Sequence, residues 1–188
     1  MSHFKKLMSR CLAGLAGRDR FCRNESGAAA VDFAMVLLPF LAVLMAIIES
    51  AIVLLAGQVL QTAATNSARL ILTGQAQNSG WSLAQFQNSV CANLTVMFNC
   101  ASNLHIDVRS FSSFSSVSLP TADNCNGTAN SYAYQPGNPG DVVVVRLIYR
   151  WPIFASALGI GLVNCAGNTN TLVASAAFRN EPYAIAGQ

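Results

Sequence analysis

The longest apolar run of the chain lies near its N-terminus, within residues 27–60. It carries no charged residue over positions 33–48, and Asp32 and Glu49 stand at the two ends of that uncharged stretch. A bilayer's hydrocarbon core needs about 20 apolar residues in helical form. At about 1.5 Å per residue, a helix over residues 28–49 would be roughly 31 Å long. The pattern therefore predicts one transmembrane helix with an acidic residue near each end.

After Glu49 the pattern changes from uniformly apolar to amphipathic. Small and apolar residues recur at intervals of three and four, while polar residues fill the other faces of the helix. The recurring set is Leu60, Ala63, Ala64, Ser67, Ala68 and Ile71. Its small members favour close packing, either on another helix or on the chain's own C-terminal domain. Pro39 is expected to kink the helix and Gly74 to stop it, so that one long helix covers residues 28–73.

The remaining residues, 74–188, predict a small mixed domain. Ser82 and Gln85 form a capping-box pattern that begins a helix. Its apolar face comprises Leu83, Phe86, Val90, Leu94 and Met97 or Phe98. Three strands are expected at residues 104–109, 141–151 and 171–179 from alternation and from β-branched content. The Ser-, Asn-, Gly- and Pro-rich residues 112–140 are expected to form a long loop, and residues 153–163 a loose helix or surface loop.

These elements define an α+β fold. A long N-terminal transmembrane helix continues as an amphipathic stalk, followed by a small antiparallel three-stranded sheet packed with one or two helices, because a three-stranded sheet alone buries too little. The expected domains are a basic cytoplasmic leader (1–27), the transmembrane and stalk helix (28–73) and a periplasmic α+β domain (74–188).

Charge sets the expected orientation in the membrane. Residues 1–26 hold six Lys and Arg against two acids, which gives a local net charge of +4, while the whole chain carries +3. A basic segment can bind nucleic acid. Because this one directly precedes an apolar span, retention on the cytoplasmic side is the favoured interpretation and no nucleic-acid partner is expected. The N-terminus is thus expected in the cytoplasm and the C-terminal domain in the periplasm of a single-pass inner-membrane protein.

The six cysteines lie on both sides of the predicted membrane span. Four lie beyond the apolar run, at Cys91, Cys100, Cys125 and Cys165. An even number of cysteines in an oxidising compartment predicts disulfide bonds, although four cysteines allow three pairings. The preferred pairing joins Cys91 to Cys100 and Cys125 to Cys165. The spacing does not suit zinc, so no metal or other cofactor is expected.

The entry to the apolar run resembles the cleavage pattern of type IV prepilins. In that pattern a glycine ends a basic leader, and an acid followed by an aromatic residue comes five places after the cut. Gly27, Asp32 and Phe33 fill these places, with Ala28 as the new N-terminus. Asp32 would lie one helical turn from the freed amine of Ala28, where a carboxylate can neutralise it and suits the helix dipole. The alternative is a signal-anchor helix that Asp32 merely caps.

A wider set of residues resembles the TadE-like family, minor pilin-like (pseudopilin) proteins of the tight-adherence, Flp-type pilus assembly system. The set comprises the run Gly27-Ala-Ala-Ala-Val-Asp-Phe-Ala-Met-Val-Leu-Leu-Pro-Phe-Leu41, Ile48-Glu49, Ala63-Ala64, Ala68-Arg69 and the C-terminal Phe178–Tyr183. The resemblance covers most of the chain, from Gly27 to Tyr183; it is strongest over the first 45 residues of that span and weak between Gly74 and Gly140. Asp32 replaces the Glu that is commoner in pilins, which is a conservative change.

The resemblance implies a role in Flp/type IVb pilus secretion and assembly. It implies a prepilin peptidase that cuts between Gly27 and Ala28, an assembly role for Asp32, Phe33 and Glu49, and other pilin and pilus-machine subunits as partners. Possible extraction from the membrane into a pilus is also implied. The alternative is an uncleaved, signal-anchored periplasmic binding domain.

An enzyme is not expected. His105 and Asp107 share one strand face, and Ser110 or Ser112 lies nearby, but one strand rarely supplies a whole catalytic triad. An exposed polar strand face is the preferred interpretation, with Arg109 joining it only where the strand bends.

Overall fold

The computed structural model describes residues 25–94, 97–122, 125, 131–154, 156, 161–165 and 167–184. The chain divides into two compact units, residues 1–45 and 46–188. Helix α2 (Glu25–Leu72) supplies all the described residues of the first unit and the first element of the second. It runs through Pro39 without interruption, and Gly74, the expected stop, follows it with a φ of +74°.

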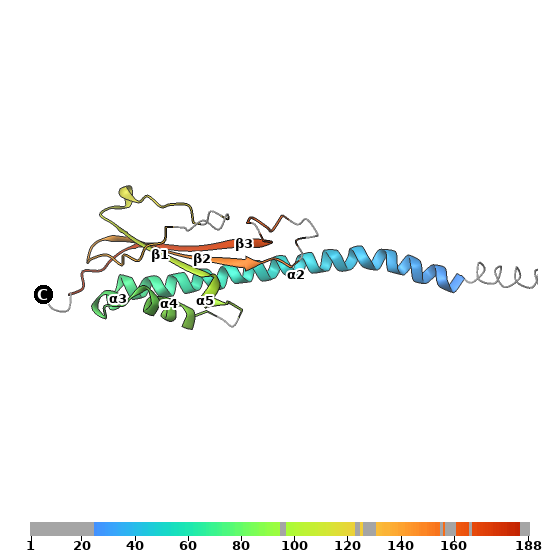
Figure 1. Ribbon diagram of the computed structural model, residues 1–188, viewed down its shortest axis with the longest axis horizontal. Coiled ribbons are helices and arrows are strands. Elements are labelled where there is room, and N and C mark those ends of the chain that lie inside the picture. Colours follow the sequence, from blue (N-terminus) through green and yellow to red (C-terminus); the bar gives the residue numbers. More distant parts are fainter. Residues whose placement is uncertain are drawn as a thin grey trace, which may run out of the picture. The chain divides into compact units, whose positions relative to one another are not determined.

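The second unit contains the predicted antiparallel sheet, in the order β1–β2–β3 (Figure 1). The strands are β1 (Leu104–Phe111), β2 (Val142–Pro152) and β3 (Thr169–Arg179). Val145 pairs with Val108 on one side and with Ala176 on the other, which aligns the apolar faces of all three strands. The α+β fold class expected from the sequence is therefore confirmed.

One face of the sheet forms the core with α2. Alternate strand residues such as Val108, Val145 and Ala174 lie in one buried cluster with Leu60 and Ala64 of α2. The side chain of Gln61 also donates to the Ser175 carbonyl at 3.1 Å, which ties α2 to β3. The small residues of the amphipathic half thus pack on the chain's own C-terminal domain.

Three short helices join the same domain: α3 (Gln75–Asn78), α4 (Leu83–Ala92) and α5 (Cys100–Asn103). The Ser82–Gln85 capping box at the start of α4 is present. The expected continuation to Met97 or Phe98 is wrong, because α4 ends at Ala92 with Asn93 as its C-cap. Phe86 and Val90 are buried as predicted, whereas Leu83 and Met97 are exposed.

The described part of the 112–140 loop is more ordered than its composition indicates. It contains a 3₁₀ turn, η1 (Phe114–Ser116), and a short parallel bridge between Tyr134 and Val108. The N–H of Val108 donates to the Ala133 carbonyl at 2.7 Å, and the N–H of Gln135 donates to the Val108 carbonyl at 2.9 Å. The loop therefore extends the sheet beside β1.

Disulfide bonds join Cys91 to Cys100 and Cys125 to Cys165. These are the pairs preferred from the sequence. The first bond links the end of α4 to α5. The second links the 112–140 loop to the segment before β3.

Candidate functional site

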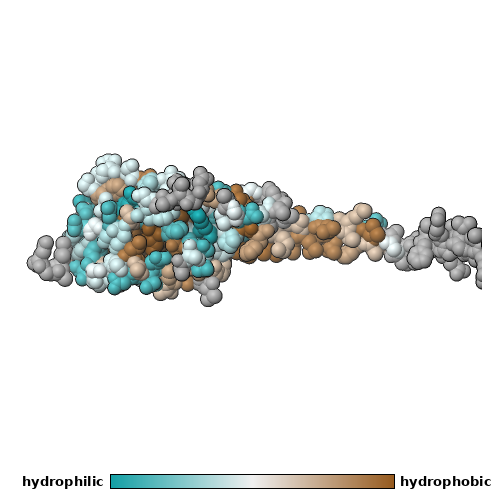
Figure 2. All heavy atoms as spheres, in the orientation of Figure 1, coloured by the Kyte–Doolittle hydropathy of each residue, from teal (hydrophilic) through white to brown (hydrophobic). Residues whose placement is uncertain are grey.

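The first candidate site is the apolar part of α2 in residues 25–45. Its large side chains are exposed, and they form the brown part of the helix in Figure 2. They include Phe33, Met35, Val36, Leu38, Phe40 and Val43. Within α2, an 18-residue window is apolar enough to cross a membrane, and none of it is buried. By length and composition, this helix is compatible with a single-pass membrane anchor.

The residues of the predicted cleavage site lie at the start of α2. Gly27 is exposed, and a Cβ added to it would meet nothing within 4 Å. Ala28 follows in the same helical turn. Asp32 and Phe33 are both exposed one turn later. A peptidase or a neighbouring subunit could therefore reach this motif without displacing any of the described residues around it. The basic residues 1–24 lie outside the described part.

Glu49 occupies a different environment from Asp32. It lies in the second unit, is only 7% exposed, and accepts a hydrogen bond from the backbone N–H of Phe154. It is also the first residue of the buried stripe of α2, which continues as Val53, Ala56, Leu60, Ala63, Ala64, Ser67, Ala68 and Ile71. The two acids expected near the ends of the span thus have different surroundings, one exposed and the other enclosed by the domain.

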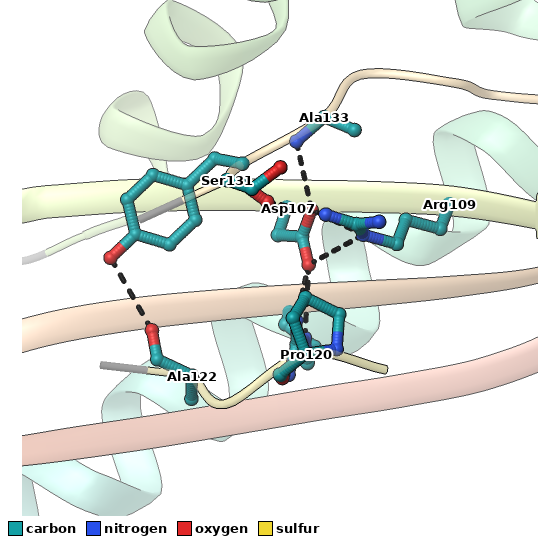
Figure 3. Close-up of polar contacts among 8 residues, drawn as sticks. Asp107, Arg109, Pro120, Ala122, Ser131 and Ala133 are labelled. Atoms are coloured by element: carbon teal, nitrogen blue, oxygen red, sulfur yellow. Dashed lines mark hydrogen bonds and ion pairs between the residues drawn. The ribbon is translucent and has the colours of Figure 1, made fainter. Parts of the chain in front are cut away.

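The second polar site lies on the face of the sheet opposite α2 (Figure 3). The carboxylate of Asp107 is 1% exposed and accepts hydrogen bonds from the Ala133 N–H at 2.9 Å and from the Arg109 Nε at 3.0 Å. It also forms an ion pair with Arg146, which is 6% exposed. Arg146 in turn donates to the Pro120 carbonyl at 2.7 Å. These contacts fasten the 112–140 loop across the strands.

The expectation of an exposed polar strand face is therefore wrong. The loop covers Asp107, and Arg109 shares its face without a bend because residues two apart on a strand point to the same side. His105 stacks on Tyr132, with ring centroids 5.0 Å apart. The carboxylate of Asp107 is engaged by two guanidinium groups, so its visible role is to hold the loop. Among the described residues, no group of three or more His, Cys, Asp or Glu side chains could hold a metal ion.

A shallow cleft of about 430 Å³ lies just beyond the C-terminal end of α2. Trp81, Tyr183 and Gln77 line it together with Pro136 and Pro139. Burial and the charge of Asp141 raise the pKa of the Tyr183 phenol. The Gln77 amide nitrogen donates to the carbonyls of Ile71 and Pro136, and its buried oxygen has no hydrogen-bond partner among the described residues.

With this geometry described, the chain can be compared with known proteins. Residues 27–69 match the family model for TadE-like proteins. The match confirms the resemblance predicted from the sequence, and it suggests a role in the assembly of Tad/Flp pili. Comparison with curated proteins and with solved structures gives no match.

The TadE-like segment lies within α2 and stops before the sheet. It contains the exposed motif at Gly27, Asp32 and Phe33 as well as the enclosed Glu49. The Asp107–Arg146 pair lies outside it, and the sequence interpretation missed it. One signal was present: Arg146 interrupts an apolar strand, and a charge at such a position needs a buried partner. No sequence signal connected Glu49 to Phe154, which lies 105 residues away.

Proposed function

We propose that this protein is a minor pilin-like subunit that takes part in the assembly of Flp/type IVb (tight-adherence) pili. The apolar part of α2 anchors it in the inner membrane, with the N-terminus in the cytoplasm and the sheet domain in the periplasm. A prepilin peptidase removes the basic leader by cutting between Gly27 and Ala28. Other pilins and pilus-machine subunits are its partners.

The observation that carries this proposal is the match of residues 27–69 to the TadE-like family, on a helix whose apolar side chains are exposed. In a folded domain an exposed apolar surface of this size marks a membrane or protein contact. The basic residues before it favour a cytoplasmic N-terminus. The buried stripe of α2 gives the sheet domain a fixed attachment to the same helix.

The carboxylate of Asp32 can contribute to assembly by offsetting the charge of a nearby amine. After cleavage, the new amine of Ala28 would be a cation at the positive end of a helix dipole, and a carboxylate one turn away offsets it. Because Asp32 is exposed, it could equally pair with the amine of a neighbouring subunit. An Asp32→Asn variant should still be cut but should assemble poorly, since the amide cannot neutralise the amine. Pilus yield, scored beside the mature N-terminus, measures both steps.

The test of processing compares two glycines of α2. Gly27→Ala and Gly57→Ala each add a methyl group that meets nothing within 4 Å, so neither substitution should disturb the helix. The protein is produced with its own secretion partners, and the N-terminus of the membrane form is determined by mass spectrometry. Wild type and Gly57→Ala should begin at Ala28, while Gly27→Ala should keep residue 1 and give no pili.

Intact leaders in all three proteins would overturn the processing step and favour an uncleaved, signal-anchored binding domain. A start beyond Leu60 in the wild type would overturn the anchor itself, because the apolar run would then have acted as a removable secretion signal.

A further inference from the structure

The contact between the sheet domain and α2 begins at one residue, Glu49. None of the α2 residues at positions 27 and 29–48 is buried. From Glu49 onwards, one stripe of the helix is buried. The exposed apolar side chains do not stop at that level. Ile47, Ile48, Ile52, Leu54 and Leu55 are between 40% and 72% exposed.

Glu49 therefore lies inside a band of exposed apolar side chains. Leu55 is six residues beyond it, which is about 9 Å along a helix. A helix from Phe33 to Leu55 is roughly 33 Å long, close to the thickness of a hydrocarbon core. If lipid surrounds this whole band, Glu49 lies about 9 Å inside its end at Leu55, below the lipid surface rather than above it.

A carboxylate at this depth needs to be kept from lipid, because an unpaired polar group in hydrocarbon is costly. The domain supplies that protection within its own chain. The turn after β2 places Ile153, 5% exposed, in the core and donates the Phe154 N–H to the Glu49 carboxylate.

The same turn presents the side chain of Phe154 outwards. At 83% exposed, it is the most exposed large hydrophobic residue of the described chain. Residues 153–163, of which it is the second, contain no charged residue. An aromatic side chain held at a bilayer boundary is a typical interfacial anchor.

We propose that the Phe154 turn is a second membrane contact of this protein: Glu49 holds the turn against α2, and the Phe154 side chain enters the lipid interface beside the helix. The partner is the lipid surface, because the hydrogen bond to Glu49 holds the turn beside the exposed apolar band of residues 33–55. This contact sets the height and tilt of the sheet domain above the membrane. It rests on the membrane anchoring proposed above.

The test places an environment-sensitive nitrobenzoxadiazole dye on single cysteines of the full chain. Cys11 and Cys22 are first replaced by Ser, and the four other cysteines stay in their disulfides. The dye is attached at Phe154→Cys, at Val43→Cys within the span and at exposed Ser115→Cys in η1. Each protein is reconstituted into phosphatidylcholine vesicles without quencher, with lipid carrying a doxyl quencher near the headgroup, and with lipid carrying it near the end of the acyl chain, which can reach the dye at 43.

The dye at position 154 should be quenched several-fold more than the dye at 115 and should show blue-shifted emission. A dye at 154 that behaves like the one at 115, while the dye at 43 is quenched, overturns the second contact and leaves the anchor standing. A dye at 43 that is not quenched overturns the anchoring itself. A dye at 154 that is shielded from water but insensitive to the quencher indicates a protein neighbour, and it also overturns the lipid contact.

Two variants test the part played by Glu49. Glu49→Gln keeps an oxygen that can accept the Phe154 N–H, whereas Glu49→Ala removes the acceptor. Quenching at 154 should persist in Glu49→Gln and fall toward the level of position 115 in Glu49→Ala. Equal quenching in both variants would show that the turn does not depend on Glu49. The dye at position 43 should be unaffected in either variant, which separates release of the turn from loss of the span.

Discussion

Asp107 is the centre of the hydrogen bonds and ion pairs on the polar face of the sheet. Among the described residues, its carboxylate is the acid that pairs with both Arg109 and Arg146, and it also accepts the Ala133 N–H of the covering loop. Removing one partner of a buried ion pair leaves an uncompensated charge, which costs more than the pair itself contributes. The free energy of unfolding should therefore be sensitive to this residue, although it lies outside the TadE-like segment.

We expect Asp107→Asn to lower the free energy of unfolding by about 3–5 kcal/mol, because Arg146 would stay buried without a counter-charge. Urea unfolding of the detergent-solubilised full chain, followed by near-ultraviolet circular dichroism, measures the change. Glu181→Gln is the matched control, since it makes the same acid-to-amide change at an exposed residue. Equal, small losses in the two variants would contradict a structural role for the Asp107 cluster.

Helix α2 combines two surfaces that serve different neighbours. Before Glu49, at positions 27 and 29–48, most of its side chains are exposed and none is buried, as in a helix that lies in lipid. Beyond Glu49 a stripe of mainly small residues is buried, and Ala56 and Ala64 are fully enclosed. Small side chains allow the backbone of the helix to approach the sheet closely. The stripe is thus selected for size as much as for hydrophobicity.

Enlarging that stripe should be harmful although it adds apolar surface. Ala64→Leu is expected to lower the free energy of unfolding by about 1–3 kcal/mol, since a close-packed interface cannot admit the added volume without displacement. The control variant is Thr62→Leu, which places the same leucine side chain at an exposed position of the same helix. Thermal unfolding by circular dichroism measures both. A stabilised Ala64→Leu variant would refute tight packing at this position.

At the scale of the whole molecule, the second unit is a sheet with helices on one face and an irregular loop on the other. The loop has little apolar periodicity, and its attachment depends on a few contacts: the Asp107 cluster, the Tyr134 bridge and the Cys125–Cys165 bond. This last bond closes 40 residues of sequence, whereas Cys91–Cys100 closes nine. The two bonds should therefore contribute unequally to stability.

On the chain-entropy model, replacing Cys125 and Cys165 by Ser should cost about 4 kcal/mol, against about 2.6 kcal/mol for the Cys91 and Cys100 pair. Denaturant unfolding of the two double variants gives the order directly. The wild type treated with a reducing agent should lose both contributions. A larger loss from the Cys91 and Cys100 pair would contradict the loop-length argument and would indicate that native packing around α4 and α5 dominates.

The sequence by itself determined the features that depend on local pattern. The apolar run, the amphipathic stripe, the Ser82–Gln85 cap and the three strands each have a period or a capping chemistry that neighbouring residues specify. The alternation of Leu104, Ile106 and Val108 identified a strand and its core-facing side. The motif at Gly27, Asp32 and Phe33 is likewise local, which is why it could be recognised without a fold.

Only the tertiary structure decided what each face meets. The alternation around Asp107 is the same whether water or a loop covers that side, and burial came from loop residues that have no period of their own. The hydrogen bond between Glu49 and Phe154 joins residues 105 positions apart. No local rule connects them, because the position of that turn depends on how the whole sheet packs against α2.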